Sequence, residues 1–140
     1  MTRFWSVGTQ GTWALRLRHV HPVRPGGPAE IVLLEPGRRE VGRLRYRVCT
    51  ACRTGRVLDI GIDESWQGQG LGREALHILL TLHPHHRWTT TTQSRQGRYF
   101  FRAMAREVST GFPSGPPLCS HLRGPLRRHT HRLCGRWLGP

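Results

Sequence analysis

The chain has 140 residues, a length that fits one domain, and 22 basic against 8 acidic residues give it a net charge of +14. All 22 basic residues are arginine, so the lysine of a Walker-type phosphate loop or of Schiff-base chemistry is missing. No segment approaches the ~20 consecutive apolar residues of a membrane helix, and the first ten residues lack a signal-peptide pattern. We therefore expect a cytoplasmic protein without a membrane partner.

The positive charge lies mainly in the flanks of the chain. Residues 1–56 carry a net +8, residues 57–107 a net +1, and residues 108–140 a net +5. An arginine-rich nucleic-acid binder is one interpretation, because arginines neutralise phosphates. The tryptophans do not gather beside arginines as a base-stacking platform requires, so we do not expect nucleic acid as the partner.

Hydrophobic periodicity predicts strands first and helices later. Four strands in an antiparallel meander are predicted at 12–20, 29–34, 41–49 and 57–62. A helix at 71–82, a strand at 87–92 and a second helix at 96–107 follow. The pattern indicates an α+β domain over residues 1–109 with a mixed, mostly antiparallel sheet. Residues 110–140, rich in Pro, Gly and Arg, are predicted to form a poorly ordered basic tail.

The most specific motif is a glycine loop between a strand and a helix, Gln67-Gly68-Gln69-Gly70-Leu71-Gly72. Free N–H groups and the dipole at a helix N-terminus make such a loop an anion site. Gly70-x-Gly72-x-x-Ala75 also matches a dinucleotide fingerprint. However, seven residues separate Ile62 from Gly70, no acidic residue stands about 20 positions on, and no βαβ pattern precedes the loop.

The stretch from Leu58 to Gly72 resembles the GNAT superfamily of N-acetyltransferases, whose signature is Gln/Arg-x-x-Gly-x-Gly/Ala after a strand and at a helix start. The resemblance covers about residues 41–107. It implies a GNAT-like fold and acetyl-CoA as co-substrate, with direct transfer of the acetyl group to an amine. The backbone of Ile60, Gly61 and Ile62 would hold the pantetheine arm. The loop would hold the pyrophosphate; its residues are Gln67, Gly68, Gln69, Gly70, Leu71, Gly72 and Arg73.

Two departures from the family pattern bear on activity. Only residues 21–28 separate the first two predicted strands, where the family has two helices that shape the acceptor pocket. Phe101 stands where the family places a tyrosine that protonates the leaving thiolate, and Tyr99 lies two residues away. A CoA-binding relic without catalysis is therefore an alternative. Asp59, Asp63 and Glu64 are the candidate general bases, and we retain Asp59 and Glu64 as predicted catalytic residues.

Cys49-x-x-Cys52 lies on a predicted hairpin turn, as zinc-binding pairs often do. Further ligands could come from Cys119 with His121, or from His129, His131 and Cys134. Because 66 residues separate Cys52 from Cys119, far more than in compact zinc modules, we expect free thiols and no metal. The histidines at 83, 85 and 86 follow a helix end, where positive charge would complement the helix dipole.

Overall fold

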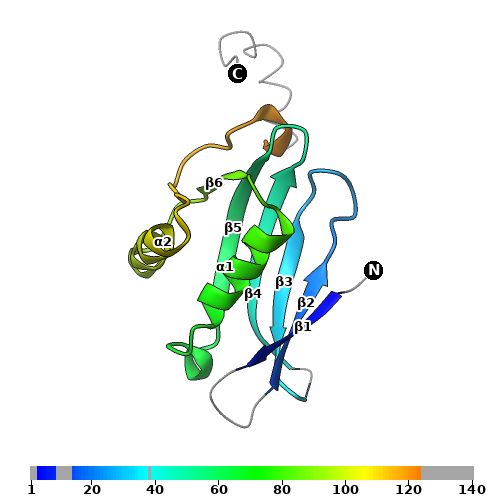
Figure 1. Cartoon of the computed structure of the whole chain (residues 1–140), viewed down its shortest axis with the longest axis vertical. Coiled ribbons are helices and arrows are strands. Elements are labelled where there is room, and N and C mark those ends of the chain that lie inside the picture. The colour runs from blue at the N-terminus through cyan, green and yellow to red at the C-terminus, as the bar shows by residue number, and fades with distance from the viewer. Residues whose placement is uncertain (1–2, 9–13, 38, 124–140) are drawn as a thin grey trace.

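A computed structural model describes residues 3–8, 14–37 and 39–123, and Figure 1 draws the remainder as a grey trace. The described residues form a six-stranded sheet in the order β1-β2-β3-β4-β5-β6. The strands are β1 (Arg3–Gly8), β2 (Ala14–Val20), β3 (Ala29–Leu34), β4 (Glu40–Cys49), β5 (Thr54–Ile62) and β6 (Arg87–Thr90). The helices are α1 (Leu71–Leu82) and α2 (Arg95–Val108), with short 3-10 turns at Glu64–Trp66 (η1) and Ser120–Leu122 (η2).

Each strand pairs with its neighbour in the chain, so the sheet is a meander until its last step. The first five strands are antiparallel, and β6 returns parallel to β5 after the crossover through α1. A short hairpin turn would have made β6 antiparallel to β5. The two strands can run parallel because α1 carries the chain back to the other end of the sheet. The predicted α+β class with a mixed, mostly antiparallel sheet is confirmed.

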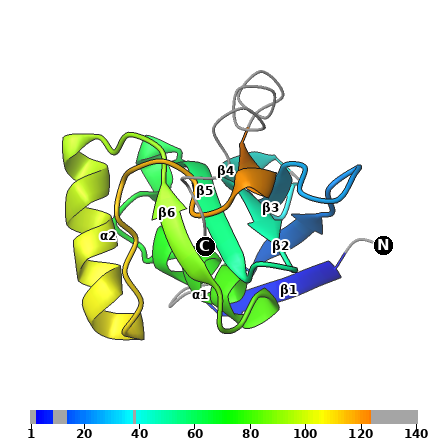
Figure 2. The same cartoon turned by 90° about the horizontal axis from the view of Figure 1, so that it is seen from above.

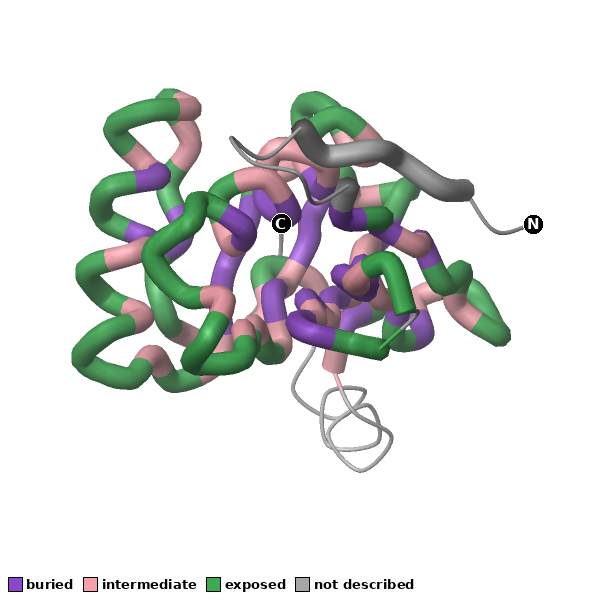
Figure 3. The backbone as a smooth tube through the Cα atoms, turned by 90° about the horizontal axis from the view of Figure 1, so that it is seen from below, coloured by how far each residue is buried: buried purple, intermediate pink, exposed green. Residues whose placement is uncertain are grey.

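The main core lies between α1 and the central strands. Helix α1 buries one face, and it packs on β3, β4 and β5 (Figure 2). Its buried residues are Leu71, Ala75, Leu76 and Leu79, and Ile31, Leu33, Leu44 and Val57 face them from the strands. Figure 3 shows the buried residues along the central strands, whereas the loops and much of α2 are exposed. No helix among the described residues is long and apolar enough to cross a membrane.

The structure corrects the predicted elements at three places. Strand β1 was not predicted, because its residues Arg3–Gly8 mix aromatic and polar side chains without clear alternation. Strand β5 begins at Thr54 rather than at residue 57, and β6 ends at Thr90 rather than at residue 92. The helices agree with their predicted positions: α1 spans 71–82 as expected, and α2 is extended by one residue at each end of 96–107.

The first part of the expected tail is packed against the domain, so the predicted boundary at residue 110 is wrong. Phe112 is 4% exposed, and its ring lies 5.6 Å from that of Phe101. Ser114 forms a parallel bridge with Thr90, which extends the sheet beyond β6. Leu122 is 1% exposed. Residues 124–140 of the predicted tail lie outside the described residues.

A buried polar cluster occupies the core beneath the end of α1. The Tyr46 hydroxyl lies 2.6 Å from His19 Nε2 and 3.2 Å from His83 Nε2. Burial, together with the nearby His86 and His19, lowers the pKa of His83 to about 4. His83 is therefore neutral near neutral pH. The helix-dipole interpretation is wrong for this residue, because it requires a charged ring.

We expect His83 to make the fold acid-sensitive. Its pKa is about 4 in the folded protein and about 6.5 when unfolded, so the unfolded chain binds more protons between these values. The unfolding free energy is then highest above about pH 6.5 and falls as the pH drops toward about 4. Urea titrations across this range should show a shallower pH dependence for His83→Gln than for the wild type.

The matched control for this prediction is His85→Asn. His85 is exposed, and its φ of 62° suits asparagine. This variant should keep the slope of the wild type. An unchanged slope in His83→Gln would show that another group carries the acid sensitivity.

Candidate functional site

The site is built where strand β5 separates from β6. The two strands pair in parallel only from Thr54 with Arg87 to Val57 with Thr90. On the other side of β5, Asp59 pairs with Arg45 and Val57 with Tyr46, so Leu58 is an extra residue in a β-bulge. A bulge bends the strand and increases its local twist. The last four residues of β5, Asp59 to Ile62, lie beyond the pairing with β6 while they remain paired with β4.

Two backbone N–H groups of β5 face the resulting gap. The Asp63 N–H points toward β4, where it donates to the Val41 carbonyl oxygen at 2.8 Å. Consecutive residues of a strand point their N–H groups to opposite edges, so those of Ile62 and Ile60 point away from β4. The Ile62 carbonyl oxygen, on the same edge, accepts a hydrogen bond from Gln67 Nε2 at 2.9 Å. This free edge can therefore hydrogen-bond an extended ligand.

The glycine loop borders the same gap. Gly68 and Gly70 both have φ of 77°, a left-handed conformation that glycine adopts without steric cost, and a Cβ on either would meet nothing within 4 Å. Gly70 is the N-cap of α1, so the N–H groups of the first turn have no partner within the helix. Gly72 has a different role: a Cβ there would lie 3.3 Å from the Phe100 ring of α2.

A cleft of about 650 Å³ joins these features. One wall is the free edge of β5, and the opposite wall is one face of α2 from Gln96 to Glu107, which includes Phe100 and Phe101. The glycine loop closes one end. The segment from Thr90 to Ser94 forms the floor between the two walls. Thr91 joins this segment to β5 by two hydrogen bonds. Its N–H donates to the Val57 carbonyl oxygen at 3.1 Å, and its hydroxyl donates to the Leu58 carbonyl oxygen at 2.7 Å.

Arg73 supplies positive charge at the rim of the cleft. Its guanidinium lies 2.7 Å from a Glu107 carboxylate oxygen, which is also 2.7 Å from His77 Nε2. Hydrogen bonds from His77 and Arg73 lower the pKa of Glu107. The ion pair is exposed, so it costs little to separate, and an incoming phosphate can compete with Glu107 for the guanidinium.

Most residues predicted to hold a cofactor line this cleft. Ile60, Gly61, Ile62, Gln67, Gly68, Gly70, Leu71, Gly72 and Arg73 all contribute to its surface, whereas Gln69 does not. Of the predicted catalytic residues, Asp59 lies on the cleft and is exposed. Glu64 lies on η1, away from the cleft lining. Tyr99 is 62% exposed and also lies off the lining.

Sequence reasoning missed most of the floor of the cleft, whereas the family pattern had already placed Phe101, on the α2 wall, at the position of the thiolate acid. Gln93 is the main example: its Nε2 donates to Thr90 Oγ1 and to the Phe112 carbonyl oxygen, both at 2.7 Å. These bonds anchor the segment that follows β6 to the packed chain near residue 112. The run of four threonines, Thr89–Thr92, was the only signal in the sequence, and it indicated a strand but no ligand contact.

The chain resembles two solved structures over part of its length. No protein-family model and no curated protein matches the chain. Among solved structures, it is similar to an acetyltransferase candidate from Deinococcus radiodurans, with 14% identity and a TM-score of 0.49. It is also similar to a GNAT-family acetyltransferase from Streptococcus pneumoniae, with 22% identity and a TM-score of 0.48.

Both similarities are partial. Each covers 55% of this chain, and 53% and 58% respectively of the two solved chains. The chain therefore matches little more than half the length of either structure.

The prediction that the glycine loop holds the pyrophosphate of CoA can be tested with Gly70→Val, which should weaken CoA binding while the domain stays folded. A β-branched residue resists φ of 77° at a cost of about 1–3 kcal/mol, and its side chain would occupy the open space beside the first-turn N–H groups. We expect the affinity to fall at least about tenfold. Isothermal titration calorimetry with CoA measures the loss, and circular dichroism verifies the fold.

Gly37→Val is the matched control for the loop variant. Gly37 lies in the β3–β4 turn, and a Cβ there would also meet nothing within 4 Å. This variant should bind CoA as the wild type does. A folded Gly70→Val variant with unchanged affinity would contradict the assignment of the loop.

Proposed function

We propose that the protein is an acyl-CoA-dependent N-acetyltransferase that moves an acetyl group from acetyl-CoA to an amine. The observation that carries the proposal is the separation of β5 from β6 directly beside the glycine loop. It provides an extended edge for a pantetheine arm and, at its end, an anion site for a pyrophosphate. A nucleotide without a long arm would leave the β5 edge unused.

In this proposal the backbone of β5 both positions and activates the thioester. The N–H groups of Ile60 and Ile62 face the cleft, where they would hydrogen-bond the arm and polarise the acetyl carbonyl. The amine nitrogen then attacks the carbonyl carbon and forms the new N–C bond. The C–S bond breaks, and the sulfur leaves as thiolate, which takes up a proton.

Few side chains on the cleft could transfer a proton. Among the described residues that line the cleft, Asp59, Arg73 and Glu107 are the ones with ionisable side chains, and Arg73 and Glu107 pair with each other. Asp59 is therefore our candidate to accept the proton of the amine. The CoA thiol is itself moderately acidic, with a pKa near that of cysteine at about 8.5, so water can protonate the leaving group.

The acceptor amine would approach over an open surface. The connection between β2 and β3 is only residues 21–28, so no helix from this connection covers the cleft. An open approach suits an amine on a large or extended molecule better than a small amine that needs enclosure.

The proposal is tested by release of free CoA thiol from acetyl-CoA with a panel of amines, including peptides and polyamines. We expect amine-dependent release, and we expect Asp59→Asn to lower the rate without changing CoA affinity. Glu64→Gln is the control, since this carboxylate lies off the cleft lining. Failure of acetyl-CoA to bind at all would overturn the proposal.

A second candidate function is CoA binding without turnover. The specific observation in its favour is Phe101, which is 6% exposed on the α2 wall and cannot donate a proton. Tight binding of acetyl-CoA together with no thiol release from any amine would select this alternative. The cleft would then serve to sense or to sequester acyl-CoA.

If the protein is an enzyme, it works without a tyrosine acid. Tyr99→Phe should leave the rate unchanged, because Tyr99 lies off the cleft lining. Phe101→Tyr adds a hydroxyl to the cleft wall and should raise the rate, since general acid catalysis contributes about 10²–10⁴-fold when well placed. Thiol release at saturating acetyl-CoA measures both. A large loss of rate in Tyr99→Phe with unchanged CoA affinity would contradict this.

A further inference from the structure

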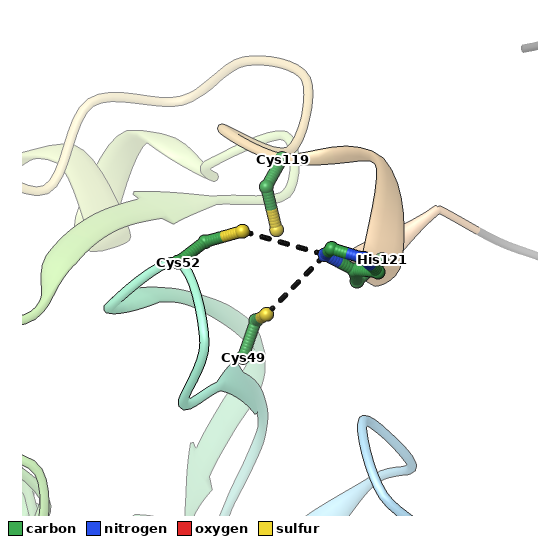
Figure 4. A group of neighbouring side chains, drawn as sticks. All are labelled: Cys49, Cys52, Cys119 and His121. Atoms are coloured by element: carbon green, nitrogen blue, oxygen red, sulfur yellow. Dashed lines mark hydrogen bonds between the residues drawn. The ribbon is translucent and has the colours of Figure 1, made fainter. Parts of the chain in front are cut away.

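Four metal-binding side chains meet at the end of the sheet opposite the cleft. Cys49 ends β4, Cys52 lies in the β4–β5 turn, and Cys119 and His121 come from the packed segment after α2 (Figure 4). The three sulfurs and one ring nitrogen all lie within 4.8 Å of one another. His121 Nδ1 is 3.4 Å from Cys49 Sγ and 3.4 Å from Cys52 Sγ. Residues 69 positions apart in the sequence thus share one small site.

These distances fit one tetrahedral metal ion. With Zn–S bonds of about 2.3 Å and a Zn–N bond of about 2.0–2.1 Å, tetrahedral angles place sulfur and nitrogen about 3.5 Å apart. The same geometry places two sulfurs about 3.8 Å apart. The observed spacings therefore need only small side-chain adjustments to surround an ion. Three thiolates and one imidazole form a complete ligand set of the structural type, with no position left for a substrate.

Hydrogen bonding alone accounts poorly for this arrangement. One Nδ1 atom carries at most one proton, yet it lies equally close to two sulfurs, and the sulfur of Cys119 points into the same space (Figure 4). Thiols are weak donors and weak acceptors, so they gain little from gathering around one nitrogen. A divalent cation at the centre would satisfy all four donor atoms together.

The surroundings hold the four ligands in place. Thr54 Oγ1 donates to Cys119 Sγ at 3.0 Å, which supplies a hydrogen bond to a ligand sulfur. The Arg47 guanidinium donates to the carbonyl oxygens of Leu122 at 2.8 Å and Gly26 at 2.6 Å. Its positive charge also lies near a site that would carry a net negative charge with Zn²⁺ and three thiolates.

We propose that Cys49, Cys52, Cys119 and His121 form a structural Zn²⁺ site. The ion fastens the segment near residue 120 to the β4–β5 hairpin, which explains how a chain rich in Gly and Pro stays packed there. This function does not depend on acyl transfer. The site lies at the start of β5, whereas the cleft lies at its end.

The test begins with the wild-type full chain, expressed without a histidine tag in zinc-containing medium. Native mass spectrometry should show one Zn²⁺ per chain, and the denatured mass should show all cysteines reduced. A chelator should remove the metal and lower the thermal unfolding temperature, and added Zn²⁺ should restore it. Co²⁺ in place of zinc should give a thiolate-to-metal charge-transfer band of a multi-thiolate tetrahedral site.

Ligand variants then assign the site to these residues. The side chains of Cys52 and His121 lie toward the surface. The variants Cys52→Ser and His121→Ala should lose zinc or bind it about 10- to 100-fold more weakly than the wild type. Cys134→Ser is the control for cysteine removal, because four ligands are complete without it, and it should retain the metal. Zinc retention is measured by competition with a chromophoric chelator.

Several outcomes would overturn the proposal. A reduced wild-type protein that is metal-free and takes up no zinc would do so, as would a disulfide between two of the three cysteines. Bound iron in place of zinc would contradict the choice of ion. Unchanged zinc content in both Cys52→Ser and His121→Ala would show that zinc binds elsewhere, for example at other histidines.

Discussion

The site depends on the pairing of β5, which continues along β4 to the end of β5 but stops along β6 after Val57. Strand β4 holds β5 along its whole length, while β6 leaves it after Val57. If β6 continued alongside, the N–H groups of Ile60 and Ile62 would be used within the sheet. Instead β6 ends at Thr90, beside the bulge at Leu58, and α2 borders the gap with Phe100 close to Gly72. The cleft is thus a consequence of interrupted strand pairing.

The first residues of β5, unlike its last ones, have a paired strand on each side. Here Thr54 to Val57 are paired with both β4 and β6. The segment after α2 adds two hydrogen bonds to β6. The Thr90 N–H donates to the Pro113 carbonyl oxygen at 2.9 Å, and the Gly115 N–H donates to the Thr90 carbonyl oxygen at 3.1 Å. Gln93 connects the same segment to the floor of the cleft. The proposed metal site would therefore stabilise the position of β6 from a distance, without contact with the ligand.

The high positive charge of the chain contributes little to this arrangement. Several arginines of the sheet pair with the few acidic residues, as Arg43 does with Glu30 and Glu40. Arg47 binds backbone carbonyl groups. At the cleft, Arg73 is shared with Glu107. The local roles of these arginines are structural, so net charge by itself is a poor guide to the partner of this protein.

The sequence by itself determined most of the elements and the glycine loop. Helix α1, bounded by Gly70 and Pro84, and the alternation in β3 and β4 are local signals, because side-chain periodicity and backbone freedom act over a few residues. Only the tertiary structure decided the bulge at Leu58, the packing of Phe112 and the meeting of Cys52 with His121. These features depend on contacts between residues far apart in the chain. The number of residues between them does not predict how close they lie in space. For that reason the 66 residues between Cys52 and Cys119 favoured free thiols, although the fold brings Cys49, Cys52, Cys119 and His121 together.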